Sequence, residues 1–103
     1  MKAPPRPNNI GKRRRITTIT GRKIHLAVID EIVVPQGAGK LIYFQKLKFE
    51  EDGRVEYRFA YYMLGQKPSR RGRWVFGQYC LMIPKRELTV LLKKARARGW
   101  QGI

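Results

Sequence analysis

The stretch RVEYRFAYYML, residues 54–64, alternates between two kinds of side chain along its whole length. One side of an extended chain would carry an apolar stripe made of Val55, Tyr57, Phe59, Tyr61 and Met63. The other side would carry Arg54, Glu56, Arg58, Ala60 and Tyr62. A period of two is typical of a half-buried β-strand and leaves little room for a helix. The stretch therefore predicts a sheet with one face in the core.

The segments around this strand extend the sheet. Glu51-Asp52-Gly53 supplies the residues of a tight turn, so residues 40–50 and 54–64 are expected to form a hairpin. Residues 16–20 and 24–34 are rich in β-branched side chains and predict a second hairpin around Gly21-Arg22. One face of residues 24–34 is expected to carry Ile24, Leu26, Val28, Ile32 and Val34. Pro35–Gly39 marks a loop, residues 65–72 a basic loop, and residues 73–82 a last strand.

A helix is expected after Pro84, which suits a first helical turn. Leu88, Leu91, Leu92 and Ala95 recur on one helical face, and Gly99 followed by Trp100 has the pattern of a Schellman cap. The fold class that follows is α+β. We expect a curved antiparallel sheet of four to six strands, followed by one C-terminal helix packed on one face.

The length of 103 residues suits one domain. We expect residues 1–12, with their prolines and asparagines, to form a flexible basic arm, and residues 13–103 to form a single α+β nucleic-acid-binding domain. Cys80 is the only cysteine, so an intramolecular disulfide is excluded. We expect no cofactor, no metal and no membrane partner. A soluble protein of the cytoplasm or nucleoid, or of the nucleus in a eukaryote, is the expected location.

The net charge of the chain and its distribution indicate what kind of partner the protein binds. The 23 Lys and Arg residues against 7 Asp and Glu give a net charge of +16. Residues 1–23 contain no acid and residues 65–103 contain only Glu87, so the charge comes from the two ends. Self-repulsion on this scale indicates an anionic partner, and the segregation of charge is typical of nucleic-acid binding.

The face opposite the apolar stripe is the predicted binding surface, because cations neutralise phosphates while rings stack on bases. Its strand residues are expected to be Arg54, Arg58, Tyr62, Lys46 and Lys48, with Phe44 beside the two lysines. The loop adds Lys67, Arg70, Arg71, Arg73 and Trp74, and the arm adds Arg13, Arg14 and Arg15. These predict sequence-tolerant binding of single-stranded DNA or RNA. Each aromatic ring taken singly fits a core position as well.

Catalysis has little support, because His25 and Cys80 are each the only residue of their type and cannot assemble a nucleophile with its base. No enzyme activity is therefore expected. Two alternatives stay open. One is a structural protein of a ribonucleoprotein or chromatin particle, with the arm between phosphates. The other is a metal-dependent nuclease, which would bring Asp30 near Glu50.

The order of four strands and a helix over residues 40–98 also resembles the transcriptional-coactivator family known as positive cofactor four. The resemblance is carried by Tyr61-Tyr62-Met63, Lys67-Pro68, Arg70-Arg71-Gly72 and Ile83-Pro84. It implies a homodimer that grips single-stranded DNA on curved sheets, with basic and aromatic strand residues as contacts.

Overall fold

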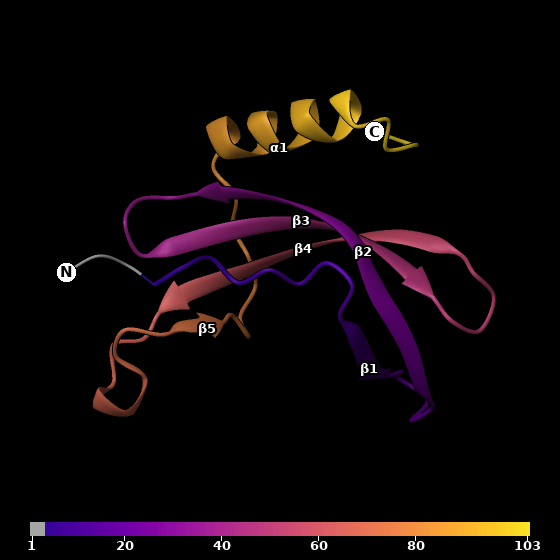
Figure 1. Ribbon diagram of the computed structural model, residues 1–103, viewed down its shortest axis with the longest axis horizontal. Helices are drawn as coiled ribbons and strands as arrows, with labels where there is room; N and C mark the ends of the chain where they lie inside the picture. The colour runs from indigo at the N-terminus through magenta and orange to yellow at the C-terminus, as the bar shows by residue number, and fades with distance from the viewer. Residues whose placement is uncertain (1–3) are drawn as a thin grey trace.

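A computed structural model describes residues 4–103 (Figure 1). Five strands form one antiparallel sheet in the order of the chain, and a single α-helix follows them. The elements are β1 (Arg13–Thr17), β2 (Lys23–Pro35), β3 (Lys40–Phe49), β4 (Val55–Leu64), β5 (Trp74–Phe76) and α1 (Lys85–Ala97), with a short 3₁₀ turn at Pro68–Arg70. The predicted α+β class, curved sheet and C-terminal helix are confirmed. None of the described residues forms a helix of the length and hydrophobicity that a bilayer crossing requires.

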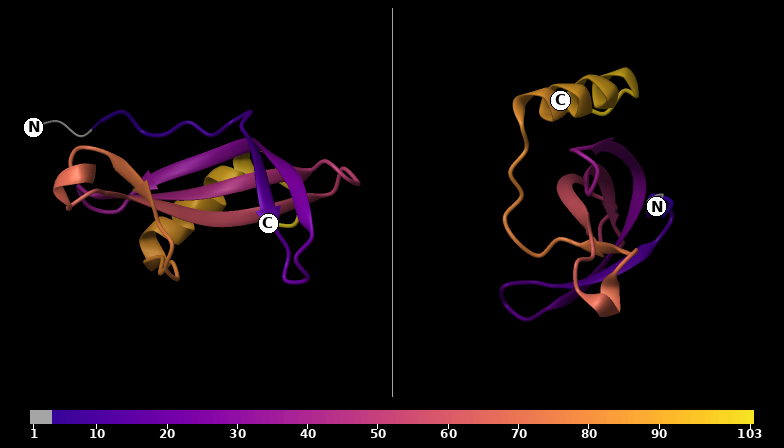
Figure 2. Two further views of the ribbon diagram at one scale, coloured as in Figure 1. Left: turned by 90° about the horizontal axis from the view of Figure 1, so that it is seen from below. Right: turned by 90° about the vertical axis from the view of Figure 1, so that its left-hand side faces the viewer.

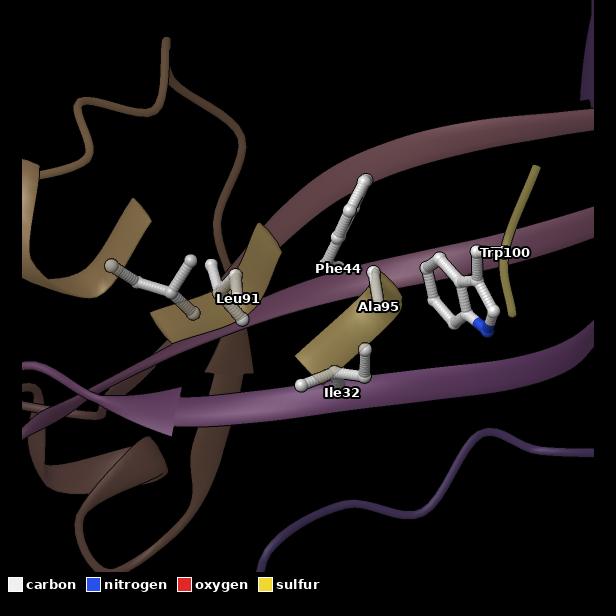
Figure 3. Packing of buried hydrophobic residues seen from close by; sticks show 6 residues of the cluster. Ile32, Phe44, Leu91, Ala95 and Trp100 are labelled. Atoms are coloured by element: carbon white, nitrogen blue, oxygen red, sulfur yellow. The ribbon is translucent and has the colours of Figure 1, made fainter. Parts of the chain in front are cut away.

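The helix packs on one face of the sheet and makes the principal core with β2 and β3. Figure 3 shows Leu91 and Ala95 of α1 beside Phe44 and Ile32 of the sheet. Trp100 closes this cluster, and its indole ring lies stacked on Tyr57 of β4 at 5.4 Å. We call this side the helix face. The apolar stripe of residues 54–64 lies on it, as predicted, although α1 leaves Phe59 and Met63 partly exposed.

The end of the helix follows the sequence prediction. Gly99 adopts φ 77°, its N–H donates to the carbonyl of Arg96, and the N–H of Trp100 donates to the carbonyl of Ala95. These two bonds define a Schellman cap, which satisfies carbonyl groups left free by the last turn. The cap also directs Trp100 back into the core, where it is 4% exposed.

The sheet curls into a half-barrel because β2 contains a bulge. Its pairing with β3 shifts between Val28 and Asp30, so the residue of β2 between these two has no partner on β3. An extra residue reverses the side-chain alternation. The prediction of one continuous apolar face in β2 is therefore wrong: Ile32 packs under the helix, whereas Val28 packs with Leu47 on the opposite, concave face.

The last strand is shorter than the predicted residues 73–82. β5 ends at Phe76, and Gly77 packs against the ring of Tyr61 so closely that a Cβ atom would overlap it. The N–H of Gly77 donates to the carbonyl of Tyr61, and the hydroxyl of Tyr61 accepts from the N–H of Tyr79. These contacts turn the chain out of the sheet, and residues 77–84 run to the helix without regular structure.

Residues 4–12 contain no helix or strand, and they lie along the sheet rather than away from it. Figure 2 shows this segment following the length of the sheet, on the side away from the 77–84 linker. The carbonyl of Pro7 accepts from the Tyr43 hydroxyl at 2.6 Å, and the carbonyl of Pro4 accepts from the Trp74 indole at 2.9 Å. The sequence-based expectation of a flexible arm did not foresee these contacts. Residues 1–3 of that arm lie outside the described part of the chain.

Candidate nucleic-acid interface

A basic pocket opens on the concave face, between β1 on one side and β4 and β5 on the other. The curl of the sheet brings these strands together, although β1 is not their neighbour in the sheet. The pocket has a volume of about 340 Å³. Its lining residues are Asn9, Arg14, Arg15, Ile16, Val28, Gln45, Arg58, Tyr62 and Phe76. None of them is an acid, and Arg14 and Arg58 project from the concave face, so the pocket presents positive charge to solvent.

Arg58 is the best-positioned cation of the basic pocket. It is half-buried on β4, and its Nε and Nη2 atoms both donate to Oε1 of Gln45, at 3.0 and 2.7 Å. Burial lowers the pKa of Arg58, and the nearby charge of Arg14 lowers it further. A guanidinium group stays protonated in spite of such shifts. Arg58 is thus a fixed, incompletely solvated positive charge whose remaining donors are open to an anion.

A buried carboxylate holds Arg58 in place through an intermediate amide. Glu31 is 6% exposed and accepts from Nε2 of Gln45 at 2.9 Å. Asn9 donates twice to Glu31, from its backbone N–H at 2.8 Å and from Nδ2 at 3.3 Å. Because the Gln45 amide nitrogen is committed to Glu31, its oxygen must point at Arg58. The network therefore orients the arginine side chain.

Two aromatic rings flank the cations. Tyr62 and Phe76 pack edge to face, with centroids 5.3 Å apart, and Phe76 remains 44% exposed. The Arg58 guanidinium lies 5.9 Å from the centroid of Phe76. The hydroxyl of Tyr62 donates to Oδ1 of Asn9 at 3.2 Å, which fixes its ring. A partly exposed ring next to unpaired cations is what base stacking with phosphate neutralisation requires.

The structure divides the predicted site residues among several places. Arg14, Arg58 and Tyr62 come together at the basic pocket, and Arg15 borders it. Arg15 alternates with Arg14 along β1 and projects to the other face of the sheet, and so does Arg13. The Arg13 guanidinium forms an exposed ion pair with Glu50. That contact raises the pKa of Arg13 and lowers the pKa of Glu50.

Arg54 lies on the concave face as predicted, but its charge is already neutralised. It pairs with Glu51 at 3.2 Å, with Asp52 at 2.8 Å and with Glu56 at 2.7 Å, and these hydrogen bonds raise its pKa. Its guanidinium also lies over the ring of Phe49. Three carboxylates therefore already balance the charge of Arg54, which weakens its attraction for a phosphate.

The prediction that Lys46 and Lys48 share a face with Arg58 is wrong. In the β3–β4 register, Lys46 is opposite Tyr57 and Lys48 is opposite Val55, and residues directly opposite one another project to the same side. Both lysines thus lie on the helix face. Phe44, expected beside them as a stacking ring, is buried beneath α1.

The loop cations lie apart from the basic pocket. Lys67, Arg70, Arg71 and Arg73 are exposed, and none of them is among the residues that line it. Lys67 and Arg70 instead border a second hollow of about 300 Å³ with Tyr61, Met63 and Val75. Trp74 is half-buried on the concave face, where it contacts the N-terminal segment.

Besides the aliphatic Ile16 and Val28, three residues that line the basic pocket were missed from the sequence: Asn9, Gln45 and Phe76. Gln45 carried a usable signal, because alternation along β3 places it opposite Arg58 once the register is known. Asn9 lies in a segment without periodicity, and Phe76 falls in a strand whose extent was misjudged. Their placement depends on contacts that are remote in sequence, such as Asn9 with Glu31.

The described residues that line the pocket include no His, Cys, Asp or Glu. Among residues 4–103, no cluster of three or more His, Cys, Asp or Glu side chains could hold a metal ion. The two acids of the nuclease alternative have separate partners. Asp30 accepts from Arg98 at 2.8 Å and from the Trp100 indole at 3.0 Å, whereas Glu50 pairs with Arg13.

Comparison of the chain with protein-family models, with curated proteins and with solved structures found no match.

Proposed function

We propose that this protein binds single-stranded nucleic acid, DNA or RNA, with little sequence specificity and without catalysing a reaction. The observation that supports the proposal best is the basic pocket, where Arg14 and Arg58 meet the rings of Tyr62 and Phe76 and Arg15 lies at the border. Guanidinium groups neutralise phosphates, and each stacked base contributes about 1 to 3 kcal/mol. Both kinds of contact are available within one pocket.

The distribution of ion pairs supports the same conclusion. Among the described residues, the ion pairs use Arg13, Arg22, Arg54 and Arg98. The cations of the pocket belong to none of these pairs. The pocket is thus one place where positive charge is available to a polyanion, as it also is in the loop of Lys67, Arg70, Arg71 and Arg73.

The shape of the pocket favours single strands over duplexes. A volume of about 340 Å³ suits a group of the size of one nucleotide, because ligand pockets begin at about 300 Å³. A base must leave its stack to enter such a hollow. A single strand allows this at little cost, whereas a duplex must first unpair.

The proposal is tested by titrating labelled single-stranded and double-stranded oligonucleotides of equal length at two salt concentrations. We expect tighter binding of the single strand, and a log Kd that rises with log salt by about 0.7 per phosphate contact. Equal affinity for both forms would favour a packaging role in a particle. Absence of binding at low salt would contradict the proposal altogether.

A further inference from the structure

Beside β5, on the helix face of the sheet, lies the second hollow of about 300 Å³, which we call the β5 hollow. Met63 and Val75 line it and are opposite one another in the β4–β5 register, so both project to the same side of the sheet. Tyr61, two positions before Met63, projects to that side as well. Lys67 and Arg70 reach the hollow from the loop before β5, and none of its described lining residues is an acid.

The β5 hollow and the basic pocket meet at Phe76, which lines both. Phe76 is opposite Tyr62 on the concave face, whereas the next pair, Val75 and Met63, projects from the helix face. The two hollows thus lie on opposite faces of the same two strands. β5 is the last strand of the sheet and is three residues long, so a ligand can pass from one hollow to the other over the outer edge of β5 (Figure 1).

The β5 hollow offers the same two kinds of contact as the basic pocket. Lys67 and Arg70 are exposed and belong to none of the ion pairs among residues 4–103. Tyr79 lines the hollow from the 77–84 linker and is 87% exposed. Its backbone N–H donates to the hydroxyl of Tyr61 at 3.1 Å, so the main chain is anchored to β4 while the ring is left to solvent. Two available cations beside an exposed ring suit a phosphate and a base.

We propose that the β5 hollow holds a further nucleotide of the single strand that enters the basic pocket, so that the strand bends around β5 at Phe76. This inference rests on the proposed nucleic-acid binding. Lys67 and Arg70 neutralise phosphates of the strand, and Tyr79 stacks on a base. A volume of about 300 Å³ is close to that of the basic pocket and again suits a group of the size of one nucleotide.

A nucleic acid that bends around one short β-strand must be single-stranded. Duplex DNA has a persistence length of about 50 nm, whereas the longest dimension of the protein is 44 Å. A duplex therefore resists a bend over the edge of β5, and a single strand does not. The position of the β5 hollow thus gives a reason for discrimination against duplexes that is separate from the size of the basic pocket.

The loop before β5 offers a matched control, because Arg71 and Arg73 are exposed cations that do not line the β5 hollow. One double variant carries Lys67→Gln and Arg70→Gln, and the other carries Arg71→Gln and Arg73→Gln, so both lose two positive charges from the same loop. The probe is a labelled oligothymidylate of about 16 nucleotides, the largest site size of small single-strand-binding domains. We expect the first variant to reduce the dependence of log Kd on log salt by about 1.4, which is about 0.7 for each of two phosphate contacts, and the second to leave it unchanged.

Tyr79→Ala tests the stacking contact and is compared with Met82→Ala, because Met82 is 80% exposed in the same linker and does not line the hollow. Loss of one stacked base corresponds to an increase in Kd of about 5-fold to 150-fold. The salt dependence should stay the same, because no charge is removed. All the replaced side chains are exposed, so we expect every variant to fold, and circular dichroism checks this.

Equal changes for the two double variants, or an unchanged Kd for Tyr79→Ala, would overturn the inference. A saturated complex with two oligonucleotides per chain would do so too, since the two hollows would then hold separate strands. Arg58→Ala, measured in parallel, separates this inference from the proposed function. If Arg58→Ala weakens binding while the variants of the β5 hollow do not, the basic pocket binds the strand and only the role of the β5 hollow is refuted. No binding of the oligothymidylate by the wild-type chain at low salt would refute both.

Discussion

Arg54, which directly precedes β4, and Arg58 on β4 are four residues apart, and their surroundings give them different roles. Arg54 is surrounded by three carboxylates, whereas Arg58 is held by the neutral amide oxygen of Gln45. A guanidinium whose charge is balanced by carboxylates attracts a phosphate less than one that is held by a neutral amide. The two arginines are therefore a matched pair for testing the interface.

Arg58→Ala is expected to weaken single-strand binding and to reduce the dependence of log Kd on log salt by about 0.7, the contribution of one phosphate contact. Arg54→Ala is expected to leave both quantities unchanged. Fluorescence anisotropy at several salt concentrations measures both, and circular dichroism checks that each variant is folded. Equal losses for the two variants would mean that net charge, and not the basic pocket, governs binding.

At the scale of elements, the direction in which the chain leaves β5 depends on Gly77, which has no side chain. Gly77→Ala would place a Cβ atom into the ring of Tyr61, so either the ring or the 77–84 linker must move. Overpacking of this kind costs about 1 to 3 kcal/mol in the free energy of unfolding. Gly39→Ala is the control, because a Cβ there meets nothing within 4 Å and its φ is not positive. Urea denaturation of both variants measures the difference, and equal stabilities would contradict the packing argument.

The acidic residues in the turn between β3 and β4 should make the free energy of unfolding depend on pH. Hydrogen bonds from Arg22 and Arg54 lower the pKa of Glu51, and a backbone N–H together with the guanidinium of Arg54 lowers the pKa of Asp52. A carboxylate with a lowered folded-state pKa stabilises the fold above its unfolded pKa, and this stability is lost as the pH falls through the folded pKa. The free energy of unfolding should therefore hold steady near neutral pH and decline below pH 4.5, the ordinary value for Glu.

Urea denaturation at a series of pH values measures this decline. Glu51→Gln should make the decline shallower, because the substituted amide does not titrate. The effect is small, since the turn is exposed and water screens its charges. A variant with the same slope as the wild-type chain would show that the acid dependence arises elsewhere.

For the molecule as a whole, the net charge of +16 is spread over a body of 44 × 33 × 23 Å. Repulsion between cations at these separations is screened as the Debye length falls from about 10 Å at 0.1 M salt to about 3 Å at 1 M. The Tm should therefore rise with sodium chloride over this range. A variant with Arg70, Arg71 and Arg73 changed to glutamine should show a smaller rise in differential scanning calorimetry. A Tm that falls with salt would mean that the ion pairs outweigh the repulsion.

The sequence by itself determined the features that depend on near neighbours. The alternation in residues 54–64, the turn at Glu51-Asp52-Gly53 and the cap at Gly99-Trp100 are short-range patterns, and each appears in the fold as the pattern predicted. Propensity, turn chemistry and capping act over a few residues, so they can be recognised without knowledge of the rest of the chain. The strand and helix order followed from them.

Only the tertiary structure decided which side chains share a surface. Because of the bulge between Val28 and Asp30, the apolar side chains in the N-terminal half of β2 lie on the concave face. A shift of one residue changes the face of the sheet from which every later side chain projects. Sequence alternation alone also could not tell that Lys46 faces the helix while Arg58 faces the pocket. The pocket further needs β1 opposite β5, and the packing of residues 4–9 along the sheet needs contacts such as Trp74 with Pro4, 70 residues apart. Contacts across such separations form through the closure of the whole sheet, which no local pattern encodes.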